Sequence, residues 1–125
     1  MARELLQAQG KSVGLLNLRS LKPLDEAALL DVVRRGSLIV TVEDHFLTGG
    51  LYSILAEVLL RHQLTARVLP LALEERWYRP GRLSAVLEHE GFTGQHIARR
   101  IAAALGESGA TISAGPAVLE NEFAE

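Results

Sequence analysis

The fold of this chain is decided by the stretch IVTVEDH at residues 39–45, which is followed by TGGL at residues 48–51. Residues 38–42 are aliphatic or β-branched, as expected of a buried strand. The glycine pair at 49–50 permits a tight turn, and an apolar stripe with helical spacing begins directly after it. We therefore predict a strand that ends in polar residues and leads into a helix.

Extended and helical patterns alternate on both sides of this stretch. We predict a helix that begins after an Asp25 N-cap, and another that begins after Thr93. Such alternation indicates a three-layer α/β/α fold with a mostly parallel sheet of about four strands, one of them in the tail. The remaining elements are predicted from apolar spacing: strands at 11–18, 38–42 and 65–71, and helices at 2–9, 50–63, 82–89 and 94–105.

The composition fits one domain and excludes several functions. The chain has 125 residues, a net charge of -2 and no cysteine. A chain of this length can bury a core of its own. Without a basic block it lacks the main electrostatic term for nucleic-acid binding, and without cysteine it has no thiol chemistry. We find no secretory leader and no membrane-spanning run, so we expect a cytoplasmic protein that binds neither nucleic acid nor membrane.

Several motifs follow one another in an order that resembles the transketolase C-terminal domain. They are NLRSLKPLD at 17–25, EDH at 43–45, the glycine pair at 49–50, the loop ERWYRPG at 75–81 and the segment 83–93. Each motif is weak alone, but the ordered set is specific and covers almost the whole chain. The EDH form favours transketolase itself as the parent. Deoxyxylulose-phosphate synthase and the β subunits of 2-oxoacid dehydrogenases are the alternative parents.

The resemblance implies a domain without catalytic residues of its own. In the family, thiamine diphosphate and magnesium are held by the other two domains, while the C-terminal domain chiefly supports the fold and the dimer. Nothing in this chain resembles the diphosphate-binding pattern or the catalytic glutamate of those domains. We therefore expect no cofactor in this chain. The expected partners are the other transketolase domains or subunits, or a second copy of the chain.

The N-terminus departs from the family pattern, because the family's opening strand and glycine turn are missing there. The tail, ATISAGPAVLENEFAE at residues 110–125, has the pattern of a strand, a glycine turn and a helix start. We predict a joint before it, at residues 106–109. We predict a circular permutation in which the strand at 110–113 takes a central place in the sheet. The alternatives are a disordered extension and a tail exchanged with a second copy.

Under the permuted arrangement, a crevice lies at the carboxyl ends of the strands. Glu43, His45, Gly49, Gly50 and Gly115 would surround it, and two helix N-termini there could bind a small phosphate or carboxylate. His45 is the best candidate for acid–base chemistry. The alternative is structural: Glu43 caps a helix or pairs with an arginine, while the glycines serve turns and packing. No metal site is expected.

Three residues of the loop after the third predicted strand are candidates for an interface: Trp77, Tyr78 and Arg79. Exposed aromatic and arginine side chains are common anchors of protein interfaces. Packing of Trp77 in the core is an equally good alternative.

Two functions follow from the sequence. The first is a non-catalytic domain or subunit of a thiamine-diphosphate transketolase-type enzyme, which acts in folding and association. The second is a stand-alone engineered or recombined α/β domain with at most weak binding of an anion or small ligand.

Overall fold

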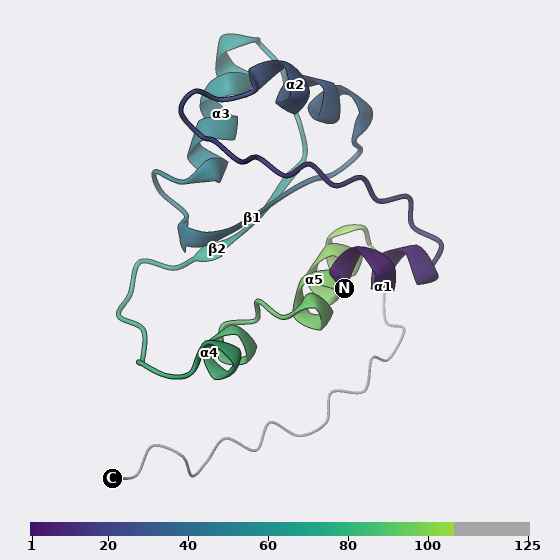
Figure 1. Ribbon diagram of the computed structural model, residues 1–125. Coiled ribbons are helices and arrows are strands. Elements are labelled where there is room, and N and C mark those ends of the chain that lie inside the picture. Colours follow the sequence, from purple (N-terminus) through teal and green to yellow (C-terminus); the bar gives the residue numbers. More distant parts are fainter. Residues whose placement is uncertain (107–125) are drawn as a thin grey trace, which may run out of the picture.

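Helices and strands alternate in the middle of the described chain, as predicted, whereas two helices follow one another at each end. The computed structural model describes residues 1–106, in which two strands are embedded among five helices (Figure 1). None of the described helices is long and apolar enough to cross a membrane. The strands are β1 (Ile39–Phe46) and β2 (Val68–Leu73), and the helices are α1 (Ala2–Ala8), α2 (Glu26–Arg35), α3 (Leu51–Arg61), α4 (Leu83–His89) and α5 (Gly94–Ala104).

The two strands form a parallel pair. Ile39 lies opposite Val68 and Val42 opposite Leu71, with an irregularity in the register between Val42 and Phe46. Parallel neighbours need a crossover connection, and α3 supplies it. The predicted strand at 38–42 is confirmed and is longer than expected, whereas the strand predicted at 65–71 begins only at Val68 and ends at Leu73.

The strand predicted at residues 11–18 was wrong for the described structure. Residues 11–20 form neither helix nor strand, and the side chain of Leu15 is 78% exposed. An apolar run becomes a strand only where a neighbouring strand offers hydrogen-bonding partners, and here none of the described strands does. The described sheet therefore has two strands, not about four. The predicted strand at 110–113 lies outside the described residues, as do Gly115 and most of the predicted joint.

Helices lie on both sides of the sheet. In Figure 1, α2 and α3 lie beyond one side of the strands, while α1 and α5 pack together on the other side, where α5 also contacts β2. This arrangement agrees with the predicted α/β/α layers. The main core joins buried apolar side chains of α2, β1 and α3, namely Leu29, Leu30, Val33, Ile39, Leu55 and Val58.

Two helices begin at the caps that the sequence predicts. The Asp25 carboxylate accepts a hydrogen bond from the Ala28 N–H at 3.0 Å. The Thr93 hydroxyl oxygen accepts one from the His96 N–H at 3.4 Å. Each cap satisfies an amide that the first helical turn would otherwise leave unpaired. Both predicted caps are confirmed.

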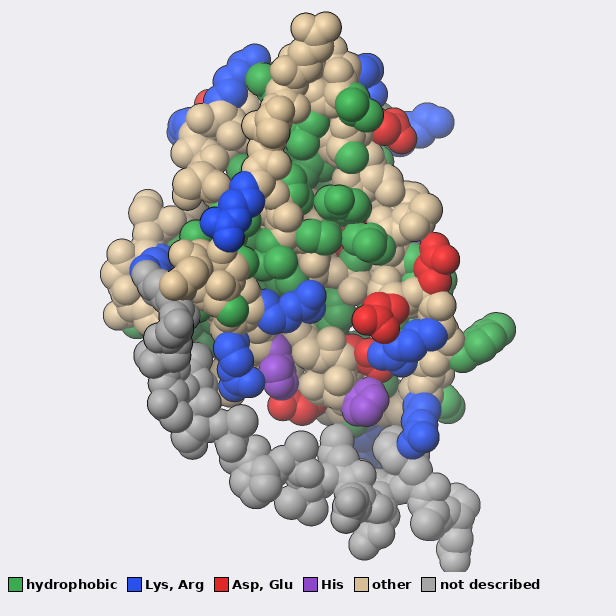
Figure 2. Space-filling view, turned by 180° about the vertical axis from the view of Figure 1, so that it is seen from behind, with side chains coloured by type: hydrophobic (Ala, Val, Ile, Leu, Met, Phe, Trp, Pro, Cys, Tyr) green, Lys and Arg blue, Asp and Glu red, His purple; other side chains and the backbone are tan. Residues whose placement is uncertain are grey.

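Much apolar surface stays exposed around this core. Figure 2 shows apolar side chains gathered over the upper and middle part of one face, with charged side chains mainly around them. Large exposed apolar residues include Leu15, Val42, Phe46, Leu60 and Trp77. Contiguous apolar surface on a protein is typical of a contact area.

Candidate functional site

The carboxylate of Glu43 lies at the N-terminus of α3. Its two oxygens accept hydrogen bonds from the Leu51 N–H at 2.5 Å and from the Tyr52 N–H at 3.0 Å. A negative charge at this end of a helix is also favoured by the helix dipole. The strand β1 therefore supplies the cap of the helix that follows it, which is the structural alternative that the sequence left open.

Gly50 is the residue that lets Glu43 reach these amides. Gly50 is buried and precedes α3, and a Cβ atom built on it would lie 2.0 Å from Oε2 of Glu43 and 3.0 Å from the Phe46 carbonyl oxygen. Any side chain at this position would push the carboxylate out of place. Gly49 serves the turn itself, because its φ of +86° lies in the left-handed region that favours glycine.

The expected anion site coincides with this cap. The helix N-terminus at Gly50 was predicted to present free N–H groups, but those of Leu51 and Tyr52 are bonded to Glu43. A phosphate or carboxylate ligand would have to displace this side chain. The second half of the predicted crevice, around Gly115, lies outside the described residues, so binding of an anion there stays a prediction.

His45 lies apart from the Glu43 carboxylate. Its exposed ring places Nδ1 3.1 Å from the carbonyl oxygen of Phe46, and the two rings meet edge to face. The carboxylate of Glu43 is turned toward α3 instead. The structure thus brings Glu43, Gly49 and Gly50 together, while His45 is on the solvent side of the same strand end.

The loop between β2 and α4 holds the three interface candidates in different surroundings. Trp77 is 99% exposed, which rules out the alternative that it packs in the core. Tyr78 is half-buried and donates a hydrogen bond from its hydroxyl to the Glu74 carbonyl oxygen at 2.8 Å. Arg79 is exposed and lines a shallow pocket that also includes Val86 and His89. Trp77 and Arg79 are therefore accessible, whereas Tyr78 supports the loop.

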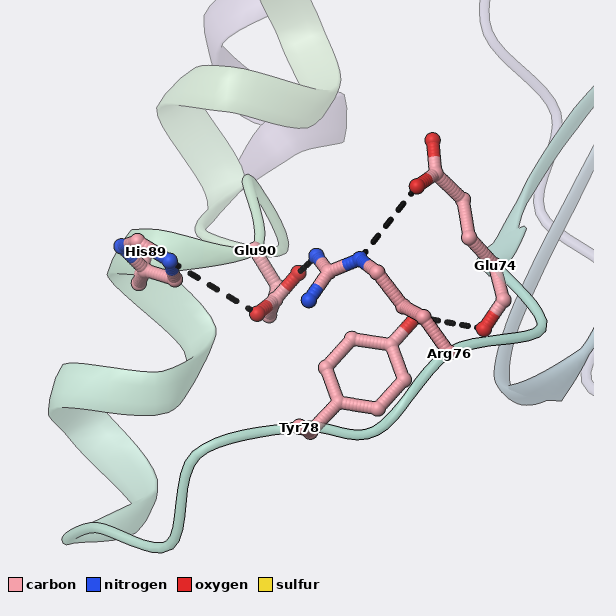
Figure 3. Close-up of polar contacts among 5 residues, drawn as sticks. All are labelled: Glu74, Arg76, Tyr78, His89 and Glu90. Atoms are coloured by element: carbon pink, nitrogen blue, oxygen red, sulfur yellow. Dashed lines mark hydrogen bonds and ion pairs between the residues drawn. The ribbon is translucent and has the colours of Figure 1, made fainter.

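Arg76, a residue that was not predicted from the sequence, fixes this loop to the end of α4. Its guanidinium lies 4.2 Å from the centre of the Tyr78 ring and pairs with the carboxylates of Glu74 and Glu90 (Figure 3). Burial would lower the pKa of Arg76, but the bonds to Glu90 and Glu74 outweigh it and raise the pKa. The contact joins residues 14 positions apart in two elements, and no local pattern signals such a pair.

A second unpredicted cluster joins α2 to the end of α3. Glu26 accepts hydrogen bonds from Arg61 at 2.9 Å and pairs with Nε2 of His62 at 2.5 Å. The hydrogen bond with His62, followed by that with Arg61, lowers the pKa of Glu26 below its usual value of 4.5. His62 thus has a specific partner, and so has His96, whose Nδ1 lies 2.8 Å from the Thr93 hydroxyl oxygen.

The described residues offer no ready site for a metal ion. Among residues 1–106, no three His, Asp or Glu side chains come together in a way that could hold one. The carboxylates of Glu43, Glu26 and Glu90 are each engaged with amides or cations.

Comparisons with known proteins agree with the motifs and the fold. The family described as "Transketolase, C-terminal domain" matches residues 1–97. A 1-deoxy-D-xylulose-5-phosphate synthase of Dictyoglomus thermophilum is 32% identical over 104 residues, which are 83% of this chain and 17% of that protein. A putative transketolase C-terminal section of Methanocaldococcus jannaschii is 32% identical over 101 residues, 80% of this chain and 31% of that one.

A solved structure extends the agreement to three dimensions. The chain resembles a protein described as "Split gene transketolase, inactive beta4 tetramer" with a TM-score of 0.74 and 30% identity, over 84% of this chain and 34% of the other. The chain thus spans about a third or less of the length of these relatives. By its motifs, its parallel α/β fold and the match over residues 1–97, the chain belongs to the transketolase C-terminal domain family.

Proposed function

We propose that this chain acts as the C-terminal domain or subunit of a thiamine-diphosphate transketolase-type enzyme. Its work would be folding and association, without a catalytic residue of its own. One observation carries the proposal: the match takes up 83% of this chain but only 17% of the Dictyoglomus synthase. A match of these proportions is expected when a chain corresponds to one domain of a larger enzyme.

The relatives support association with other polypeptides. The Methanocaldococcus relative is described as a C-terminal section, and the solved neighbour as a split-gene transketolase in an inactive tetramer. By analogy, the proposed partners are the remaining domains or subunits of the enzyme, or further copies of this chain. Both transketolase and deoxyxylulose-phosphate synthase stay open as the parent. A 2-oxoacid dehydrogenase β subunit is the third possible parent.

Thiamine diphosphate and magnesium would be bound by those partners. Magnesium in such enzymes needs carboxylate and carbonyl oxygens in a fixed geometry. Of the described carboxylates, Glu43 holds a helix N-terminus and Glu90 pairs with a cation, and no three potential ligands come together in residues 1–106. The contribution of this chain would be to cover and orient the domains that carry the cofactor.

The loop around Trp77 is the proposed association surface. Trp77 is 99% exposed, while its neighbours are held by the Arg76–Glu90 pair and by the Tyr78 hydrogen bond. A large aromatic side chain on a fixed loop loses little conformational entropy on binding, which makes it a good interface anchor. Leu83, at the start of α4, is another exposed apolar side chain in this part of the sequence, with 73% of its surface exposed.

Reconstitution tests the proposal. The Dictyoglomus synthase and a transketolase would each be shortened by the segment that this chain matches, and each mixed with the full chain. We expect co-elution with at least one of them and recovery of its thiamine-diphosphate-dependent activity. The chain alone should be inactive. Failure to bind either shortened enzyme would contradict the proposal.

A pair of variants locates the surface. Trp77→Ala should weaken the association at least tenfold. Leu60→Ala removes another exposed apolar side chain, 78% exposed on α3, and should leave association unchanged. Equal effects of the two substitutions would show that the loop around Trp77 is not the contact.

A further inference from the structure

A shallow pocket lies where the loop after β2 meets the helix α4. It has a volume of about 90 Å³, and most of its surface is apolar. Pro80 contributes to its walls from the loop, and Ala85 and Val86 contribute from α4. An apolar cavity of about 150 Å³ can bind benzene, so a pocket of this size has room for a smaller apolar group. An aliphatic side chain is such a group.

Contacts within the chain hold the walls of this pocket in place. On the loop side, the Tyr78 hydroxyl donates a hydrogen bond to the Glu74 carbonyl oxygen at 2.8 Å. On the helix side, the Arg76 guanidinium pairs with Glu90, which lines the pocket and is 9% exposed (Figure 3). A ligand would therefore meet a pocket that is already formed, and its binding would cost little conformational entropy in this chain.

The carboxylates in and beside the end of α4 have partners of their own. Among the described lining residues, Glu90 alone is acidic, and Arg76 balances its charge. The carboxylate of Glu88 lies 3.9 Å from Nδ1 of His96 in α5, and Glu88 does not line the pocket. Repulsion of an incoming anion by these groups is therefore weakened.

Two positive side chains at the pocket lack such partners within the described chain. Arg79 lines the pocket and is exposed, and its guanidinium has no ion pair or hydrogen bond with any other of residues 1–106. The same holds for Arg82, which is exposed at the N-cap of α4. His89 also lines the pocket, and its side chain is 66% exposed. The pocket thus combines apolar walls with an available guanidinium, which matches an aliphatic group beside a carboxylate.

We propose that this pocket receives an aliphatic side chain of the proposed partner subunit, and that an acidic residue next to it in the partner pairs with Arg79. The inference rests on the proposed function, because the partner is the remainder of the transketolase-type enzyme. Burial of the aliphatic side chain supplies a hydrophobic gain. A guanidinium binds a carboxylate through two parallel hydrogen bonds, which fixes the direction of the bound segment.

The position of Trp77 agrees with such a contact. Trp77 precedes Arg79 by two residues on the same loop and is 99% exposed. Residues that dominate the binding energy on two partners tend to lie beside one another. A partner that buries the indole of Trp77 would therefore come within reach of the pocket.

A peptide titration of the full chain, without any partner, tests the pocket. The probe is the tetrapeptide Gly-Leu-Asp-Gly, blocked at both ends, and NMR follows the backbone amides of Gly81, Ala85 and Val86. We expect saturable shifts at these three amides. Peptides with Ala in place of Leu, or with Asn in place of Asp, should bind about tenfold more weakly. The amides of Leu55 and Val58, in the core, report in every variant that the chain is folded.

Variants of this chain locate the binding. Ala85→Leu fills the pocket with the chain's own side chain and should abolish the shift at Gly81. Ser84→Leu places the same helix-favouring residue at an exposed position of α4 outside the pocket and should leave binding unchanged. Arg79→Gln should weaken binding of the Leu-Asp peptide but not of the Leu-Asn peptide. Equal effects of the two leucine substitutions, or of Arg79→Gln on the two peptides, would overturn the site.

The leucine substitutions also separate this inference from the proposed function. With a shortened enzyme that binds the wild-type chain, Ala85→Leu should weaken association about tenfold, whereas Ser84→Leu should not. Normal association of Ala85→Leu, despite lost peptide binding, would overturn the assignment to the partner. A dimer of this chain that is lost only in Ala85→Leu would assign the pocket to a second copy instead. A wild-type chain that binds the peptide but neither shortened enzyme would contradict the proposed function, while the pocket itself would stand.

Discussion

The starts of α2 and α3 are satisfied in two different ways. At α2, Asp25 accepts a hydrogen bond from an amide only three residues further on. At α3, the carboxylate comes from Glu43 in β1, eight and nine residues before the amides that it binds. A local cap stabilises its own helix, whereas the cap from β1 also joins the strand to the helix. The second kind depends on the packing around it, and on a glycine at position 50.

Of the substitutions at these two helix starts, Gly50→Ala should lower the free energy of unfolding the most. The new methyl group would overlap Oε2 of Glu43 and crowd the Phe46 carbonyl oxygen, so the cap would be lost and the turn strained. We expect a loss of about 2–3 kcal/mol in the free energy of unfolding. Urea unfolding followed by circular dichroism measures it. Gly14→Ala, at a position with open space around the Cβ, is the matched control.

Glu43→Ala should cost somewhat less, about 2 kcal/mol, because two amides lose a charged acceptor without added strain. Glu43→Gln keeps an acceptor but not the charge and should cost about half as much. The double variant Glu43→Ala with Gly50→Ala decides the mechanism. It should be no less stable than Gly50→Ala alone, since both remove the same contact. Full additivity would show that Gly50 is needed for another reason.

Asp25→Ala tests the local cap and should cost about 1 kcal/mol. Thr93→Ala should cost less, because its hydrogen bond to the His96 amide is 3.4 Å long. Asp25→Asn should retain most of the stability, since asparagine caps helices about as well. If Asp25→Ala destabilised the chain as much as Glu43→Ala, the distinction between local and tertiary caps would fail.

Glu26→Gln should change the free energy of unfolding least, and the size of the change should depend on pH. Its bonds with His62 and Arg61 lower its pKa in the folded chain, so its contribution is complete above the unfolded value near 4.5. That contribution is lost as the pH falls through the folded pKa. The stability difference between the wild type and Glu26→Gln should therefore shrink below pH 4.5. A difference that stays constant from pH 7 to pH 3 would contradict the linkage.

The sequence predicted the helices better than the sheet, for a physical reason. A helix satisfies its hydrogen bonds within one segment, so the caps Asp25 and Thr93 were identified correctly. A strand needs a neighbour that can lie far away in the sequence. The apolar run at 11–18 was therefore assigned to a strand although its partner is not among the described residues.

The same limit applies to the candidate site. The residues Glu43, Gly49 and Gly50 lie together, as their closeness in sequence predicts, but ligand binding by them stays a prediction. Whether the carboxylate faces a ligand or its own helix depends on the path of the turn, which the sequence left open. The Arg76–Glu90 pair links two elements and had no signal in the sequence. Exposure of Trp77 was likewise undecided, since tryptophan occurs both in cores and at interfaces.

The exposure of Trp77 decides how this protein can be observed. It is the only tryptophan, and its indole is 99% exposed in the folded chain. Its fluorescence should already be that of a solvated indole, so denaturation would change the emission wavelength little. A shift toward the blue on mixing with another polypeptide would instead report that the indole has left water. The chain thus carries a built-in optical reporter for docking rather than for unfolding.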